Sequence, residues 1–182
     1  MNLLGNLLIA PPAVKSNFWT KTVILVTEHL AQGSLGLVLN KPSDISVVAF
    51  GNQLGFELDY PGFVYVGGPV SPKNLSFLHS SEWSSTNTLR INERLSISSD
   101  HDILPRLAQG DCPDQWRILL GLCGWGPNQL ESELKGTHPW KPENSWCTAR
   151  PDIELVFGSD GKDQWCNTID RSGLEFAQSL LT

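Results

Sequence analysis

Short apolar segments separated by glycine, proline and polar residues dominate the first part of the chain. Thr22–Glu28 and Leu35–Asn40 are rich in β-branched and aliphatic residues, which is typical of β-strands. Because successive positions in both segments are apolar, we expect central strands that are covered on both faces. His29–Ser34 then forms the loop of a hairpin, with Gly33 available for a positive φ.

Later apolar runs predict further strands, and helical spacing predicts several short helices. The additional strands are expected at Phe63–Val66, Leu75–His79, Leu89–Ser98, Arg117–Cys123 and Ile153–Phe157. Helices are expected within 46–54, 100–110, 127–135 and the last twenty residues. Their ends are marked by Ser46 as an N-cap, by Pro127 in a first turn, and by Gly55, Gly110 and Gly136 as stops.

Paired strands with interspersed helices, rather than strict alternation of the two, are typical of an α+β fold. The sequence therefore predicts a curled, largely antiparallel, barrel-like sheet with several short helices packed on it. A chain of 182 residues is long enough to bury a substantial core. We expect one domain spanning residues 1–182, with a barrel-like part and an α+β part as the alternative subdivision.

The charge and composition of the chain limit the classes of function that are expected. The formal net charge is −6, and the sequence contains no basic run and no helix-turn-helix pattern. Direct nucleic-acid binding is therefore not expected. The seven tryptophans are a high number for this length, and they imply large flat surfaces that need cover or a partner.

The amino end and the cysteines indicate the compartment. Met1–Ala10 is apolar but lacks a positively charged start and is too short to span a membrane, so we interpret it as part of the fold. The four cysteines form no Cys-x-x-Cys pair, so neither a metal site nor a disulfide framework is predicted; they are Cys112, Cys123, Cys147 and Cys166. The sequence favours a cytoplasmic protein with free thiols, no membrane association, no metal and no cofactor.

A first candidate site lies in the predicted hairpin. Glu28 and His29 are adjacent at a strand end, where a carboxylate could orient an imidazole as a general base. Neighbours along a strand point to opposite faces, however, so Asn40 at the far end of the hairpin is the alternative partner of His29. The competing interpretation is a structural or solvated histidine.

A second candidate site lies where a strand leads into a helix, within residues 121–131. Its polar and aromatic residues are Trp125, Asn128, Gln129 and Glu131. Helix starts expose unpaired N–H groups that suit anions or polar ligands. In the alternative, Glu131 and Glu133 only complement the helix dipole, and the neighbouring glycines let Trp125 enter a crowded core.

Three other stretches have simpler explanations. Gly67-Gly68-Pro69-Val70 lacks the spacing of a phosphate-binding loop, so a tight strand exit is favoured. Cys123 lies in an apolar run without a neighbouring base, which favours a buried inert thiol over a nucleophile. The loop His138-Pro139-Trp140-Lys141-Pro142, followed by Trp146, either grips a ligand ring or covers a core edge.

Taken together and in order, these stretches resemble the YqgE/AlgH family of bacterial proteins, from about residue 5 to residue 157. The matching positions are Gly5, Leu8-Ile9-Ala10, Pro12, Phe18, Val23-Ile24, His29, Gly33, Gly36, Asn40, Pro42, Gly67-Gly68-Pro69-Val70, Leu78-His79, Gly121, Gly124-Trp125, Gln129-Leu130-Glu131 and Glu133. The chain departs from the family pattern at Cys123, where Ala is usual, and at Asn128, where Gly is common.

The resemblance implies a compact α+β fold with a barrel-like sheet in a cytosolic bacterial protein. It implies no agreed catalytic residues, although some members carry the label of transcriptional regulator. With no catalytic signature, the sequence favours a non-enzymatic regulatory or interaction protein with an unknown protein or small-molecule partner, as a monomer or weak oligomer. The alternative is an enzyme or small-molecule binder with a pocket near His29, Asn40 and Gln129. The candidate ligand-binding residues are His29, Asn40, Trp125, Asn128, Gln129 and Glu131.

Overall fold

The computed structural model describes residues 2–15, 18–139, 141–142 and 145–180. The strands are β1 (Leu7–Ile9), β2 (Val23–Leu30), β3 (Gly33–Val38), β4 (Pro42–Ser46), β5 (Phe63–Val66), β6 (Val70–Ser80), β7 (Leu89–Arg90), β8 (Leu95–Ser98), β9 (Trp116–Trp125) and β10 (Cys147–Ala149). The helices are α1 (Val47–Gln53), α2 (Ile103–Ala108), α3 (Gln129–Lys135), α4 (Ile153–Phe157) and α5 (Gly161–Ser179).

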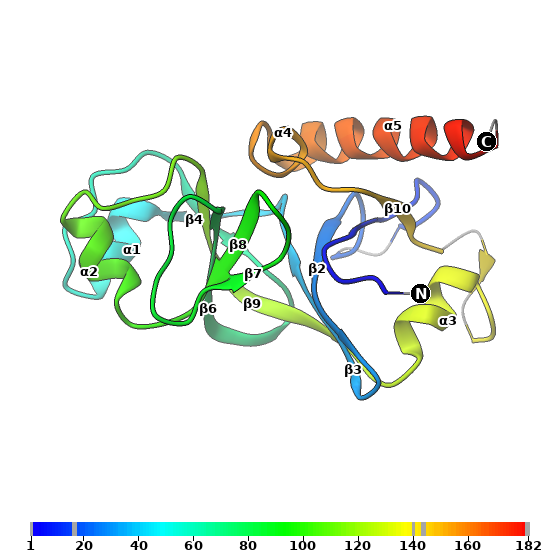
Figure 1. Cartoon of the computed structure of the whole chain (residues 1–182), viewed down its shortest axis with the longest axis horizontal. Coiled ribbons are helices and arrows are strands. Elements are labelled where there is room, and N and C mark those ends of the chain that lie inside the picture. The colour runs from blue at the N-terminus through cyan, green and yellow to red at the C-terminus, as the bar shows by residue number, and fades with distance from the viewer. Residues whose placement is uncertain (1, 16–17, 140, 143–144, 181–182) are drawn as a thin grey trace.

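The strands form one curled, largely antiparallel sheet, which confirms the predicted α+β, barrel-like fold. Its main path runs β10-β1-β2-β3-β9-β6-β8-β7, while β5 pairs with both β4 and β9. The β5–β9 pair is parallel and the other pairs are antiparallel. Figure 1 shows β9 running between the end that carries α1 and α2 and the end that carries β2, β3 and α3. The two ends of the molecule therefore share one long strand.

The predicted hairpin is present, and the first half of β2 is fully buried. β2 pairs with β3 from Ile24↔Val38 to Leu30↔Gly33, and Gly33 has a φ of 143°. The turn between them is shorter than predicted, since only residues 31 and 32 lie outside the two strands. The positive φ explains why a glycine is suited to the point where the second strand begins.

Both faces of β2 are covered, as the sequence predicted. All four residues from Val23 to Val26 are fully buried. Val23 and Leu25 pack in one apolar cluster together with Trp165 of α5, whereas Ile24 and Val26 pack in another cluster on the opposite face together with Leu130 of α3. Burial of each such side chain contributes about 1.5–3 kcal/mol. The hairpin is thus held between α5 on one side and α3 on the other.

Two predicted strands are wrong, and local polar groups explain both differences. Leu89–Ser98 is two short strands, β7 and β8, because the Asn92 Oδ1 atom accepts hydrogen bonds from the backbone N–H groups of Arg94 and Leu95 and turns the chain. Residues 153–157 form helix α4, because the Asp152 carboxylate caps the helix by accepting from the Leu155 N–H at 2.8 Å.

The predicted helices are confirmed apart from small shifts of their ends. Ser46 caps α1 by accepting from the Ala49 N–H, Gly136 ends α3 with a φ of 59°, and the terminal segment forms the long helix α5. The sequence did not predict the short strands β1, β4 and β10. In the part of the chain that the structure describes, no helix combines the length and the apolar character needed to cross a membrane.

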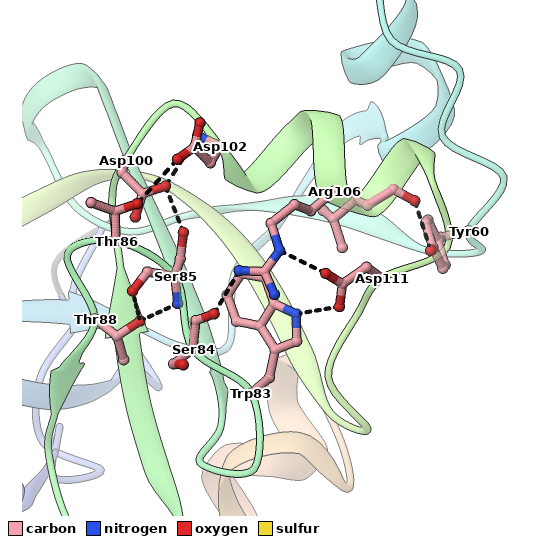
Figure 2. A network of polar contacts seen from close by, with 11 residues as sticks. Tyr60, Trp83, Ser84, Ser85, Thr86, Thr88, Asp100, Asp102, Arg106 and Asp111 are labelled. Atoms are coloured by element: carbon pink, nitrogen blue, oxygen red, sulfur yellow. Dashed lines mark hydrogen bonds and ion pairs between the residues drawn. The ribbon is translucent and has the colours of Figure 1, made fainter.

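A polar network ties the loop after β6 to helix α2 at one end of the molecule (Figure 2). Asp111 accepts from Trp83 Nε1 at 2.9 Å and from Arg106 Nε at 2.7 Å. The Arg106 guanidinium also lies 4.1 Å from the centre of the Trp83 ring. The hydrogen bond from Arg106, followed by that from Trp83, lowers the pKa of the Asp111 carboxyl. This network fixes the loop geometry far from the candidate site residues.

Candidate functional site

The junction of β9 and α3 supplies the centre of the candidate site. β9 ends at Trp125, and Asn128 adopts a left-handed backbone conformation with a φ of 58° before α3 begins at Gln129. Asn128 is exposed and its side chain makes no capping hydrogen bond. The tight turn directs α3 back along β9, so that the helix residue Glu133 meets the strand residue Trp125.

A buried carboxylate, Glu133, joins three elements of the site. Its Oε2 atom accepts from Trp125 Nε1 at 3.0 Å and from Trp146 Nε1 at 2.7 Å. Its Oε1 atom accepts from Gln129 Nε2 at 2.9 Å, and Gln129 Oε1 accepts in turn from the Gly126 N–H at 3.0 Å. The side chain is only 8% exposed. Glu133 therefore fixes the positions of two indole rings and of the start of α3.

These residues form the wall of a cleft with a volume of about 410 Å³. The cleft is lined by Val14, Lys15, Trp19, Pro69, Val70, Cys123, Gly124, Trp125, Gln129, Glu133 and Trp146. The Trp19 and Trp146 rings are nearly perpendicular, with an interplanar angle of 86° and their centres 6.0 Å apart. Three indoles and a few polar groups thus surround one concave surface, which is typical of small-molecule sites.

Cys123 contributes to this wall, but its thiol is buried and unreactive. It is 1% exposed, and its Sγ atom lies 3.7 Å from the Gly67 carbonyl oxygen, to which it donates. Burial raises the pKa of the Cys123 thiol to about 12. The thiolate is therefore scarce at neutral pH. The prediction of a buried inert thiol is confirmed.

The glycine-rich segment after β5 serves backbone packing, as predicted. A Cβ atom placed on Gly68 would collide with the backbone of Leu122 in β9, and Gly68 has a φ of 155°. Only glycine permits this close approach of the two chains. The segment brings Pro69 and Val70 to the edge of the cleft.

His29 is not among the residues that line the cleft, although it contacts α3. Its Nδ1 atom lies 2.8 Å from Ser34 Oγ, and its Nε2 atom lies 3.5 Å from Glu131 Oε1. A carboxylate of α3, that of Glu131, therefore approaches the imidazole. Positions 131 and 133 point in different directions because successive helix residues turn by about 100°.

The structure does not bring Asn40 together with His29 or Gln129. Asn40 is 3% exposed; its Oδ1 atom accepts from the Val23 N–H, and its Nδ2 atom donates to the Lys21 and Gly161 carbonyls. Val23 and His29 are six residues apart along β2, a distance of about 20 Å. A pocket that joins His29, Asn40 and Gln129 is therefore absent among the described residues, because Asn40 ties α5 to the start of the hairpin.

Of the six candidate residues, only Trp125 and Gln129 line the aromatic cleft. The sequence reasoning missed Glu133 as the central group, and it missed Lys15 and Trp19 altogether. The i, i+4 spacing of Gln129 and Glu133 is the one signal that could have joined these two on a single helix face. The aromatic loop contributes Trp146, while its Trp140 lies outside the described residues.

No three His, Cys, Asp or Glu side chains come together as metal ligands within the described residues. All four cysteines are free. The arrangement that the structure does present is a fixed aromatic surface with one buried carboxylate.

Comparison with known proteins identifies the family. Residues 7–177 match the AlgH-like family, DUF179. A UPF0301 protein from Photobacterium profundum is 34% identical, with 96% of this chain and 94% of that protein covered. A UPF0301 protein from Vibrio cholerae is 32% identical, with 98% and 96% covered. This chain belongs to the AlgH-like family, which confirms the resemblance found in the sequence.

Solved structures agree with this assignment. The solution structure of the AlgH protein from Pseudomonas aeruginosa matches with a TM-score of 0.75 at 32% identity, over 94% of this chain and 89% of that chain. The crystal structure of protein DIP2367 from Corynebacterium diphtheriae matches with a TM-score of 0.69 at 21% identity, over 92% and 85% of the two chains. The second match supports the fold alone. None of these names states a reaction, and the family's function is uncharacterised.

Proposed function

We propose that this protein is a non-catalytic binding protein of the bacterial cytoplasm and that its ligand site is the aromatic cleft. The observation that carries the proposal is the concave surface of three indoles, two of which are held in place by the buried Glu133 carboxylate. Rigid aromatic walls bind a ligand at low entropic cost, because few side chains must be ordered on binding.

The chemistry of the cleft supports binding rather than catalysis. Its thiol, Cys123, is buried with a pKa of about 12, and the Glu133 carboxylate already accepts three hydrogen bonds. Both groups are therefore poorly available as a nucleophile or a base. Four free cysteines are consistent with a reducing compartment, which supports the cytoplasmic location.

The indole N–H groups provide a direct test in solution. In ¹⁵N-labelled protein, the Nε1–H resonances of Trp19, Trp125 and Trp146 are followed while a small-molecule extract of bacterial cells is added. We expect these three resonances to shift, whereas those of Trp83 and Trp165, whose N–H groups bond to Asp111 and to the Ala10 carbonyl, stay in place.

A pair of matched variants separates cleft binding from other effects. Val70 lines the cleft and is 46% exposed, so Val70→Phe fills part of the space without disturbing the core. Val48 on α1 is 40% exposed and does not line the cleft, so Val48→Phe is the control. Val70→Phe should abolish the shifts and Val48→Phe should keep them. Absence of any cleft-specific shift, or equal shifts in both variants, contradicts the proposal.

A further inference from the structure

We infer that the group recognised in the aromatic cleft is an organic cation, meaning an ammonium or guanidinium group. This inference rests on the proposed function, because it names the chemistry of the ligand for the same cleft. Two independent features point to it, namely the charge of the wall and the geometry of its rings.

The first feature is a buried carboxylate that forms no ion pair with any described side chain. In the part of the chain that the structure describes, the donors to Glu133 are two indoles and an amide, all of them neutral. Within the described residues, the ion pairs involve Glu131, Asp111 and Asp152 instead. A buried charge is costly unless it is paired, so a cation entering the cleft gains from an ion pair that no side chain of the described fold makes with Glu133.

The carboxylate also retains capacity to accept. Among the described residues, the Oε2 atom accepts from both indole N–H groups, whereas the Oε1 atom accepts only from the Gln129 amide. A carboxylate oxygen offers about two lone-pair positions. A ligand N–H group can therefore bond to Oε1 of Glu133, while a fully methylated ammonium would be attracted to it by charge alone.

The second feature is the set of aromatic rings around this carboxylate. The face of an indole carries negative electrostatic potential and attracts a cation within about 6 Å of the ring centre. Trp19 and Trp146 stand at 86° to one another, so they form two walls of a corner, and Trp125 borders the same space. Aromatic corners of this type with a nearby carboxylate are suited to ammonium and guanidinium groups.

One cationic side chain opposes this preference. Lys15 lines the cleft, but it is exposed, so water and salt screen its charge more strongly than that of the buried Glu133. Lys15 and Glu133 are the two charged side chains among the described lining residues. We therefore expect Lys15→Gln to raise the affinity for cations by about two-fold, which is typical of exposed charges.

Three probes of similar shape test whether the cleft prefers a positive, a neutral or a negative group. Choline is the cation, 3,3-dimethylbutan-1-ol is its neutral isostere, and 3,3-dimethylbutanoate is an anion of similar size. A second pair, n-butylguanidinium and n-butylurea, tests the planar cation against a planar neutral group. Affinities are measured from the Nε1–H resonances of Trp19, Trp125 and Trp146. At least one cation should bind about ten-fold more tightly than its neutral partner, a difference of about 1.4 kcal/mol.

Variants connect any preference to the named residues. Glu133→Gln should reduce the ratio of cation to neutral affinity to near one, and Trp19→Leu should weaken cation binding more than Trp19→Phe, which keeps an aromatic face. Because Glu133 is buried and its replacement can disturb folding, the Trp19 pair and Lys15→Gln provide the same test at two less buried residues of the cleft.

The outcomes separate this inference from the proposed function. Equal binding of a cation and its isostere at the cleft indoles overturns the inference but leaves the cleft as a ligand site. Stronger binding of 3,3-dimethylbutanoate that is lost in Lys15→Gln assigns the site to anions and also overturns it. If neither cation shifts the cleft resonances at tens of millimolar while the cell extract does, the inference fails alone; if the extract also has no effect, both fail.

Discussion

Replacing Glu133 with alanine tests the central physical claim about the cleft, namely that one carboxylate holds its wall together. Glu133→Ala removes the acceptor for the N–H groups of Trp125, Trp146 and Gln129 at once. The variant should leave β9 and α3 intact, because Ala is a favourable helix residue. Any loss of stability therefore reports on the tertiary contacts.

The three donors differ in how readily water can replace the carboxylate. Trp125 is 7% exposed, so its N–H group would stay unsatisfied at a cost of about 1–3 kcal/mol. Trp146 and Gln129 are half-buried and regain water, so each adds less, about 0.5 kcal/mol. The lost burial of the Glu133 stem adds to the cost, while relief from burying a charge offsets part of it. We expect the free energy of unfolding to fall by about 3 kcal/mol.

Urea denaturation followed by far-ultraviolet circular dichroism measures this change without relying on the altered tryptophans. With a slope of about 2 kcal/mol per molar urea, the midpoint should fall by about 1.5 M. Glu133→Gln should lie between Ala and the parent protein, because an amide keeps one acceptor oxygen.

Glu131→Ala is the matched control on the same helix. The Glu131 side chain is 34% exposed and lies 3.5 Å from His29, so its removal should cost less than about 1 kcal/mol. If Glu133→Ala and Glu131→Ala lower the midpoint equally, or if Glu133→Ala costs less than 1 kcal/mol, the carboxylate does not hold the wall and the reasoning is wrong.

Three further predictions concern stability and partner class. His79 is fully buried between the Ser80 carbonyl and the Ser98 hydroxyl, and burial lowers its pKa. The unfolded chain protonates His79 near pH 6.5, while the folded chain does not. The contribution of His79 to the free energy of unfolding should therefore be complete above that pH and should decline as the pH falls toward the folded pKa. Urea midpoints at pH 7.5 and 5.5 should differ less in His79→Asn than in the parent protein. The buried Arg117 guanidinium donates to the Leu39 and Ser159 carbonyls and to Gln164. Arg117→Met should therefore lower the free energy of unfolding, measured by urea denaturation, by about 3 kcal/mol. A change below about 1 kcal/mol would show that these bonds do not stabilise the fold. Given the net charge of −6, fluorescence anisotropy with duplex DNA at physiological salt should detect no sequence-selective binding, and nanomolar affinity for one sequence would refute this expectation.

The sequence predicted correctly those elements whose hydrophobic pattern matches their burial in the folded chain. Thr22–Glu28 and Leu35–Asn40 are apolar at successive positions because both faces of β2 and β3 are covered, so their pattern reports the real burial. The prediction of a strand at residues 153–157 was wrong because a run of five apolar and charged residues fits a strand or a helix equally well. In the structure, the Leu155 N–H donates to the Asp152 carboxylate, and this capping bond favours the helix.

The candidate site was predicted only in part because its central interactions join residues from distant parts of the sequence. Trp125 and Gln129 could be recognised from the strand-to-helix junction, but the role of Glu133 depends on Trp146, thirteen residues further along, whose indole bonds to the same oxygen. Asn40 shows the opposite failure. Its amide looked available for chemistry, yet it donates to the Gly161 carbonyl at the start of α5, which lies 121 positions away. Whether a polar side chain serves a ligand or the fold is therefore decided by partners that only the folded chain brings near. The aromatic cleft stands out because, among the described residues, its carboxylate has neutral donors and forms no ion pair.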